Sequence, residues 1–371
     1  MPESSGPPAP APPPRAPAGP RKPLDGSTGP PTDGGPVRRR GGTPRATTIR
    51  DVARDAGVSV ATVSRVLAGS AAVSPVLADR VRASADRLGY APHSAAQSLA
   101  RGRTRLVGVL VPNLANHYFY ALIKRMLHDA ERDGYRLIVA DSDESLVAER
   151  ELGANLLRQT DGLILASPRA PANVLQALVD RGKPVLLLNR AVEAPAVSTV
   201  VVESYPAMRQ LAGHVAALGH RHVAYLQGPL HSWQSRERWR AVRTLERRGV
   251  SITALRVGAT MEAGREAVPA ILRTGATAVL AYNDLVAIGV LVGLTAHGVR
   301  VPQDMSVTGY DDIPLAGFLT PPLTTVHSPQ EEVGSVAWKT MSGLLDGDRP
   351  GARTLLAAEP VIRTSTAPPR S

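Results

Sequence analysis

The 371-residue chain contains no cysteine, only two phenylalanines and no uncharged apolar run long enough to span a membrane. Without cysteine, structural disulfides and thiolate metal sites are excluded, and a reducing cytoplasm is the expected compartment. Because a transmembrane helix needs about 18 or more consecutive apolar residues, we expect no membrane partner. The first 44 residues lack the apolar core of a signal peptide, so we expect a cytoplasmic protein without an export signal.

The sequence also lacks the motifs of the common enzyme classes. There is no G-x-S-x-G nucleophile elbow, no H-E-x-x-H pair and no glycine-rich phosphate loop. His220, His222 and His231 lie close together in the sequence, but no cysteine or suitably spaced carboxylate completes a metal site with them. We therefore interpret them as surface histidines, and we expect no catalysis, no cofactor and no bound metal.

Positive charge is concentrated at the N-terminal end of the chain. The formal net charge is +11, and residues 1–104 hold 15 basic against 7 acidic residues. A basic end on a nearly balanced body predicts contact with a polyanion, with nucleic acid as the leading candidate and a merely soluble basic tail as the alternative. Residues 1–44 are half proline and glycine, which predicts a disordered tail.

A short helical unit is predicted at residues 45–90. Apolar residues repeat with helical spacing from Ile49 to Ala56, and Gly57 can end that helix in the left-handed conformation. Ser59 and Ser74 are suited to cap a second and a third helix. Three short helices with a glycine turn between the first two are typical of a helix-turn-helix domain.

From residue 105 onward, short apolar runs alternate with amphipathic helical stretches. The predicted strands are Leu106–Val111, Arg136–Val139, Gly162–Leu165, Val185–Leu188, Val223–Leu226, Ala278–Ala281 and Ser306–Thr308. Predicted helices include Tyr120–Arg132, Pro206–Leu218 and Leu285–His297. This alternation predicts an α/β core with parallel sheets covered on both faces, whose ligands bind beyond the carboxyl ends of the strands.

Several short motifs resemble those of the LacI/GalR family of bacterial transcriptional regulators. They are TIRDVA at 48–53, AGVS at 56–59, TVSRVL at 62–67, LGYAP at 88–92, LGHR at 218–221, YND at 282–284, GYDD at 309–312 and PLTTV at 322–326. The resemblance implies a helix-turn-helix domain followed by a core like that of periplasmic sugar-binding proteins. It places a first subdomain at residues 105–202 plus 328–345. The second subdomain is expected at residues 203–327 plus the C-terminal end of the core, which ends at residue 365, and a tail follows at 366–371.

The resemblance also implies which residues contact DNA. The second helix of the unit enters the major groove, where Arg65 can bond to a guanine edge and Val60 and Ala61 can offer apolar contact. Thr62 and Ser64 are suited to phosphate oxygens. A solvated arginine and a partly buried valine are the alternatives for Arg65 and Val60. The complete set of expected DNA-binding residues is Thr48, Ser59, Val60, Ala61, Thr62, Ser64, Arg65, His93, Ala96 and Leu99.

Residues 91–104 are interpreted as a hinge helix and linker. Eight residues of helical composition, 93–100, would form only a marginal helix alone in water. The resemblance implies that two such helices of a homodimer enter the minor groove and that Leu99 wedges between base pairs. A passive linker is the alternative. A two-fold dimer predicts a pseudo-palindromic double-stranded DNA operator and a nucleoid-associated protein.

For the core, the resemblance implies an effector cleft between the two subdomains. The expected effector-binding residues are Tyr118, Phe119, Asn189, Trp233, Arg238, Asn283 and Asp311. Arg238 can fork onto vicinal hydroxyls or a carboxylate, and Asp311 can accept from hydroxyls, while aromatic rings supply a flat face. We interpret Asp284 and Asp312 as caps or ion-pair partners. A sugar is favoured because these groups, without a basic phosphate cluster, suit a neutral polyol.

The resulting hypothesis is a repressor of sugar-utilisation genes that a small-molecule effector controls. A nucleobase or a phosphorylated metabolite remains an alternative effector. An exported solute-binding protein without a DNA function is the alternative class, and the helical residues 48–89 and the missing signal peptide weigh against it.

Overall fold

The computed structural model describes residues 47–67, 73–90, 103–192 and 197–370. These residues form two compact units that divide after Tyr90, and each unit is described by itself. The expected tail at 1–44 and the hinge residues His93, Ala96 and Leu99 lie outside the described residues. Within the described ranges, no helix is long and apolar enough to cross a membrane.

The N-terminal unit is the helix-turn-helix that the sequence predicts. Its helices are α1 (Ile49–Asp55), α2 (Val60–Leu67) and α3 (Pro75–Arg87). Gly57 follows α1 with a φ of 62°, a left-handed conformation that residues with a Cβ rarely adopt. Apolar side chains from all three helices form the core, chiefly Val52, Val63, Val66 and Val81.

The second unit begins with a subdomain built on a parallel six-stranded sheet. In spatial order the strands are β11 (Arg353–Leu356), β5 (Ser198–Val202), β4 (Val185–Leu188), β3 (Gly162–Ala166), β1 (Leu106–Val111) and β2 (Arg136–Asp141). Helices α5 (Tyr118–Arg132) and α13 (Gln330–Asp346) pack on one face, and α6 (Leu146–Gln159) and α7 (Ala172–Val179) pack on the other. The central strands β3 and β4 are continuous buried apolar runs, as a sheet covered on both faces requires.

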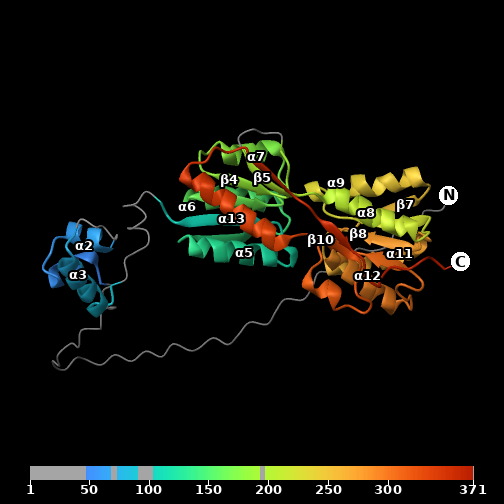
Figure 1. Cartoon of the computed structure of the whole chain (residues 1–371), viewed down its shortest axis with the longest axis horizontal. Coiled ribbons are helices and arrows are strands. Elements are labelled where there is room, and N and C mark those ends of the chain that lie inside the picture. The colour runs from blue at the N-terminus through green and yellow to red at the C-terminus, as the bar shows by residue number, and fades with distance from the viewer. Residues whose placement is uncertain (1–46, 68–72, 91–102, 193–196, 371) are drawn as a thin grey trace, which may run out of the picture. The chain divides into compact units, whose positions relative to one another are not determined.

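A second parallel sheet forms the other subdomain, which is the second lobe of the core in Figure 1. In spatial order its strands are β7 (Ser251–Arg256), β6 (His222–Gln227), β8 (Ala278–Ala281) and β9 (Ser306–Thr308). One face carries α8 (Ser204–Ala217), α9 (Trp233–Val242) and the 3-10 turn η1 (Arg243–Arg248). The other carries α10 (Met261–Glu266), α11 (Val268–Arg273) and α12 (Asp284–Ala296), and the 3-10 turn η2 (Pro314–Gly317) follows β9.

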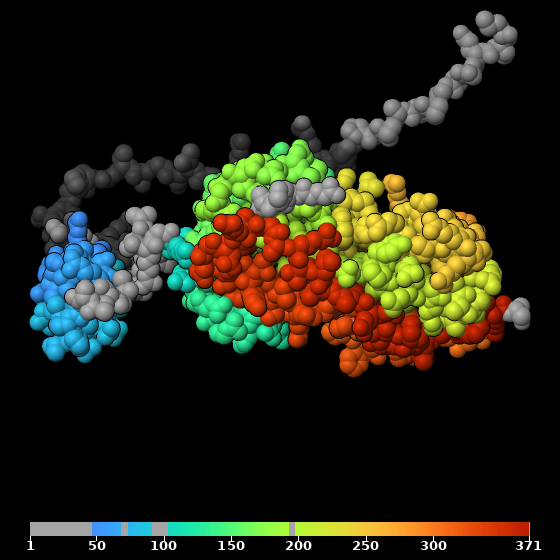
Figure 2. Space-filling model, turned by 45° about the horizontal axis from the view of Figure 1, so that its top comes forward, coloured from blue at the N-terminus to red at the C-terminus, as the bar shows by residue number. Residues whose placement is uncertain are grey.

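The chain passes three times between the two subdomains. The first passage joins β5 to α8, the second joins β10 (Thr325–His327) to α13, and the third joins β11 to β12 (Glu359–Val361). Strands β10 and β12 pair with each other as an antiparallel ribbon. In Figure 2 the red C-terminal part of the chain therefore covers parts of both lobes.

The C-terminal segment differs from the sequence-based expectation in two ways. We expected the end of the core to belong to the second subdomain, but β11 pairs in parallel with β5 of the first sheet. The described part of the expected tail at 366–371 is also packed: the backbone N–H of Ala367 donates to the Ser306 hydroxyl of β9 over 3.0 Å. A polar, proline-containing segment carries no hydrophobic pattern that predicts such packing.

The seven predicted strands are all present, with small differences in their ends. Strands β5, β7, β10, β11 and β12 were not among them. Strands β7 and β11 are sheet edges with partly exposed, mixed sequences, so their hydrophobic pattern is weak.

Candidate functional site

The exposed face of α2 is the candidate DNA-binding surface. Val63 and Val66 point into the core of the unit, whereas Val60, Ala61 and Arg65 are exposed. Val60 is 41% exposed, which argues against the alternative that it belongs to the core. The buried valines anchor the helix, and its opposite face is free to enter a major groove, which is wide enough for an α-helix.

The hydroxyl groups at the helix starts are engaged within the unit. The Ser59 hydroxyl accepts from the backbone N–H of Thr62 over 3.1 Å, so it caps α2 as predicted. The Thr48 hydroxyl donates to the Asp51 carboxylate over 2.7 Å at the start of α1. These residues therefore order the helices. The half-buried Ser64 lies one turn further along α2.

Charged groups in this unit have different roles. The Asp55 carboxylate ties α1 to α3, because it accepts from the Ser84 hydroxyl over 2.5 Å and from Arg87 over 2.6 Å. These two bonds, the one from Ser84 above all, lower the pKa of Asp55. Arg65 forms no ion pair with any described residue, so its guanidinium remains available to a base edge or a phosphate.

The candidate effector site is a cavity between the two subdomains of the core. Five of the seven residues predicted for it line this cavity, namely Tyr118, Phe119, Asn189, Arg238 and Asp311. Asn189 and Asp311 follow β4 and β9, as the sequence predicts, and Tyr118 and Phe119 begin α5. Arg238 was expected in a loop after a strand, but it lies within α9. Asn189 and Asp311 have positive φ values of 53° and 112°, a strained conformation that concentrates at functional sites.

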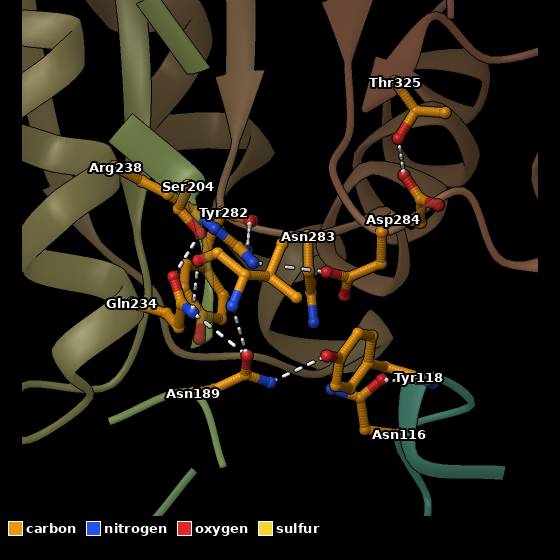
Figure 3. A network of polar contacts seen from close by, with 12 residues as sticks. Asn116, Tyr118, Asn189, Ser204, Gln234, Arg238, Tyr282, Asn283, Asp284 and Thr325 are labelled. Carbon is orange, nitrogen blue, oxygen red and sulfur yellow. Dashed lines mark hydrogen bonds and ion pairs between the residues drawn. The ribbon is translucent and has the colours of Figure 1, made fainter. Parts of the chain in front are cut away.

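Asn189 is the centre of a buried polar network, shown in Figure 3. Its side-chain N–H group donates to the Tyr118 hydroxyl over 2.7 Å. Its side-chain oxygen accepts from the backbone N–H of Val202 and from the amide of Gln234, each over 3.3 Å. Burial raises the pKa of Tyr118 to about 12, so this phenol remains protonated at neutral pH.

Arg238 and Asp311 form a buried ion pair in the second subdomain. The guanidinium donates to the carboxylate over 3.3 Å and to the Tyr282 carbonyl oxygen over 2.6 Å, and it lies 3.5 Å from the centre of the Tyr310 ring. Burial raises the pKa of Asp311 to about 6, although the Arg238 charge opposes this shift. At neutral pH the pair presents a fixed cation and an ionised acceptor to the cavity.

Two predicted effector residues do not line the cavity. Asn283 caps α12: its side-chain oxygen accepts from the Val286 backbone N–H over 3.0 Å, and its N–H group donates to the Ala259 carbonyl over 3.1 Å. Trp233 is half-buried at the start of α9, and the neighbouring Gln234 lines the cavity instead. An asparagine after a strand suits a helix cap as well as a ligand, so the sequence could not separate the two roles.

The cavity also contains residues that the sequence analysis missed. Arg169 is bound by the Glu144 carboxylate through two hydrogen bonds of 2.7 and 2.8 Å. Gln234 and Ser204 hydrogen-bond to each other at the first passage between the subdomains. Arg190 follows Asn189 in the chain and does not line the cavity itself; it is buried and forms no ion pair with any described residue. An arginine directly after a predicted ligand was the only signal available for it.

Other polar residues have structural roles. As expected, Asp284 and Asp312 act as acceptors for protein groups: Asp284 accepts from the Thr325 hydroxyl over 2.6 Å, and Asp312 pairs with Arg363 over 2.7 Å. Our interpretation of His220 as a surface histidine is wrong, because this residue is only 1% exposed. Its ring contacts the Thr277 and Ser306 hydroxyls and the Ala367 carbonyl oxygen, which anchors the C-terminal segment.

Comparisons with known proteins agree with this architecture. Residues 48–93 match the model of bacterial regulatory proteins of the lacI family, and residues 212–366 match a periplasmic binding protein-like domain. The ribose operon repressor of Bacillus subtilis is 33% identical over 303 residues, which cover 80% of this chain and 91% of that protein. The chain belongs to the LacI family.

Solved structures of LacI-family proteins match both units. The lac repressor dimer bound to its operator and the anti-inducer ONPF matches with a TM-score of 0.77 and 30% identity, over 87% of this chain and all of that one. The complex of the regulator CelR with cellobiose matches with a TM-score of 0.64 and 27% identity, over 86% of this chain and 99% of that one. As a LacI-family repressor, the protein is a DNA-binding regulator with an effector-binding core and not an enzyme.

Proposed function

We propose that this LacI-family repressor binds a pseudo-palindromic operator as a homodimer and that a small polyhydroxylated molecule, a sugar, controls its affinity from the core cavity. The main support is the convergence of buried polar side chains from both subdomains, with Asn189 on one side and the Arg238–Asp311 pair on the other. Amide, guanidinium and carboxylate groups supply fixed donors and acceptors for hydroxyls. The relatives named for ribose and cellobiose favour the same effector class.

Effector entry requires the cleft to widen. The cavity measures about 30 Å³, whereas pockets for small ligands measure roughly 300–1,000 Å³. The two subdomains must therefore separate and close again around a sugar, with Tyr118 and Phe119 as its flat face. A ligand that binds one arrangement more tightly shifts the population toward it, and the operator affinity changes with that population. We expect relief of repression.

A second effector class is favoured by one observation. Among the described residues, buried Arg190 has no carboxylate partner, its Nε atom has no hydrogen bond, and its only hydrogen bond is a 3.4 Å contact with the Ala170 carbonyl oxygen. Burial and the nearby charge of Arg236 lower its pKa. An unpaired buried guanidinium is costly. Arg190 does not line the closed cavity, so a phosphate or carboxylate on the effector would compensate this charge only after the cleft widens. A sugar phosphate is therefore the second candidate.

The DNA-bound form is proposed to use both α2 and the hinge. Arg65, Val60 and Ala61 would contact base edges, and the hinge residues His93, Ala96 and Leu99 would contact the minor groove. Folding of the hinge only against DNA would make operator binding sensitive to the separation of the two cores.

An apolar surface on the core suits the second copy. A groove of about 940 Å³ is lined by residues of α5, η2 and the start of α13, with Tyr120 and Leu315 among them. Tyr120 is 65% exposed, and Phe318, directly after η2, is 86% exposed. Large exposed apolar groups mark interaction sites. We expect Leu315→Glu to produce monomers in sedimentation velocity, and Val147→Glu, at an exposed apolar position on α6, to remain dimeric.

The experiment that tests the proposed function is operator binding with a defined effector panel. Purified protein is titrated into labelled DNA from the region that flanks its own gene, with D-ribose, D-galactose, D-xylose, cellobiose or D-ribose 5-phosphate at millimolar concentration. Release by a free sugar supports the proposal, and release only by the phosphate favours the second class. Failure to bind DNA more tightly than a scrambled duplex would refute the proposed function.

A further inference from the structure

The Gln234 side chain joins the two subdomains where the chain first passes between them. Gln234 belongs to α9 of the second subdomain, and its side-chain N–H group donates to Asn189 of the first over 3.3 Å. The same group donates to the carbonyl oxygen of Val202, the last residue of β5, over 3.2 Å. The hydroxyl of Ser204, the first residue of α8, donates to the Gln234 oxygen. All four residues are buried, and Figure 3 shows Gln234, Asn189 and Tyr118 in one connected network.

These bonds use every polar atom of the Gln234 amide. They also occupy the Asn189 side-chain oxygen, because this oxygen accepts from Gln234 and from the Val202 backbone N–H. A carbonyl oxygen has two lone pairs, so an effector hydroxyl can donate to Asn189 only after one of these donors leaves. The Val202 group is part of the backbone at the end of β5, whereas the Gln234 amide is a movable side chain. Gln234 is therefore the group that a ligand displaces.

We propose that Gln234 is a positioning residue that couples effector binding to the movement of the two subdomains. It is not an effector ligand. Its amide competes with the effector for the Asn189 side-chain oxygen, and its hydrogen bonds hold the two subdomains together where the chain first passes between them. An effector hydroxyl that donates to the Asn189 oxygen displaces the Gln234 amide. The hydrogen bonds between α9 and β5, which tie the subdomains together, are then lost. The competition rests on the proposed role of Asn189 as an effector contact, but the tie between the subdomains does not.

The tie can be tested without DNA or effector, because the chain contains no cysteine. Glu151→Cys on α6 and Arg247→Cys on η1 place one dye on each subdomain, at exposed positions. Single-molecule energy transfer then reports the populations of closed and open cores. Gln234→Ala removes the tie, and Gln159→Ala, at an exposed position at the end of α6, is the matched control.

We expect Gln234→Ala to raise the open-to-closed ratio by about three- to tenfold, the effect of losing one or two hydrogen bonds across the cleft. Gln159→Ala should match the parent. Gln234→Glu is the second variant: its carboxylate still accepts from Ser204 but cannot donate to Asn189 or Val202, so it should open the core like alanine. Thermal unfolding by circular dichroism separates opening from loss of the fold.

An unchanged distance distribution in both variants would overturn the proposal. If Gln234→Glu does not fold, because its buried carboxylate faces two carbonyl oxygens, the distance distribution of Gln234→Ala alone decides. The competition is measured with whichever sugar of the panel releases the parent from its operator. The sugar concentration for half-maximal release should be about three- to tenfold lower for Gln234→Ala than for the parent. A concentration higher than that of the parent would make Gln234 an effector ligand. If no sugar acts, the proposed function fails while the distance measurement still tests the tie.

Discussion

The Arg238 guanidinium donates to the Asp311 carboxylate over 3.3 Å, and both side chains are almost fully buried at the cavity between the subdomains. Removal of one member of such a pair leaves an uncompensated buried charge. The pair fixes the geometry of the effector site, and it belongs to a different unit from the DNA-binding helices. Variants of the pair should therefore separate effector response from operator binding.

Asp311→Ala should leave operator affinity within about twofold of the parent and abolish the response to effector, because the acceptor for ligand hydroxyls is lost. Fluorescence anisotropy with operator DNA, with and without effector, measures both quantities. Asp348→Ala, at an exposed carboxylate after α13, is the control and should respond normally. A normal response of Asp311→Ala would remove this residue from the effector site.

The effector response should depend on pH with a midpoint near the pKa of Asp311, which is about 6. Burial raises this pKa, so the carboxylate is ionised above pH 6 and becomes protonated below it. Effector affinity should be constant between pH 7 and 8 and should fall about tenfold per unit well below pH 6. Isothermal titration of the effector from pH 5 to 8 measures this profile. A flat profile in the parent would show that an ionised Asp311 is not required.

Arg65→Ala should reduce discrimination between the operator and a scrambled duplex by about 1–3 kcal/mol, the contribution of one bidentate contact to a base. Non-specific binding should keep most of its salt dependence, because the other basic groups remain. Parallel anisotropy titrations on both duplexes at two salt concentrations measure these effects. Arg82→Ala, on α3 and paired with Asp79, is the control. Unchanged discrimination would refute the assigned role of Arg65.

Local patterns predicted the helix-turn-helix and seven of the twelve described strands. The cap at Ser59 and the left-handed Gly57 depend on neighbouring residues only, so the sequence contains the information for them. The effector residues at strand ends were predictable for the same reason, since a parallel sheet brings those ends together. Asn189 and Asp311 were placed correctly at the cavity on this basis.

Contacts between distant residues could not be predicted in this way. Gln234 reaches Asn189, which is 45 positions away, and a single glutamine near a helix start has no distinctive pattern. The burial of His220 depends on the C-terminal Ala367, 147 positions away. The position of Asn283 after a strand was predicted, but its choice between cap and ligand depends on the orientation of one side chain.

His220→Ala should lower the free energy of unfolding by about 1–3 kcal/mol, because it removes the hydrogen bonds of a buried ring and leaves the space of that ring empty. The Ser306 hydroxyl and the Ala367 carbonyl would lose their ring contact, and the C-terminal segment would loosen from β9. Urea unfolding followed by circular dichroism measures the difference. His231→Ala, at an exposed position, should be neutral. Equal stability of the two variants would contradict the anchoring role of His220.

The central claim is that one chain couples specific DNA binding to a small molecule in the core. The most direct test is the anisotropy of DNA flanking its own gene at two salt concentrations, with and without the sugar panel. The account predicts tight binding to that DNA, weaker binding at higher salt as counterion release requires, and release by one member of the panel. Equal binding to flanking and scrambled DNA, or no binding at either salt concentration, would contradict it.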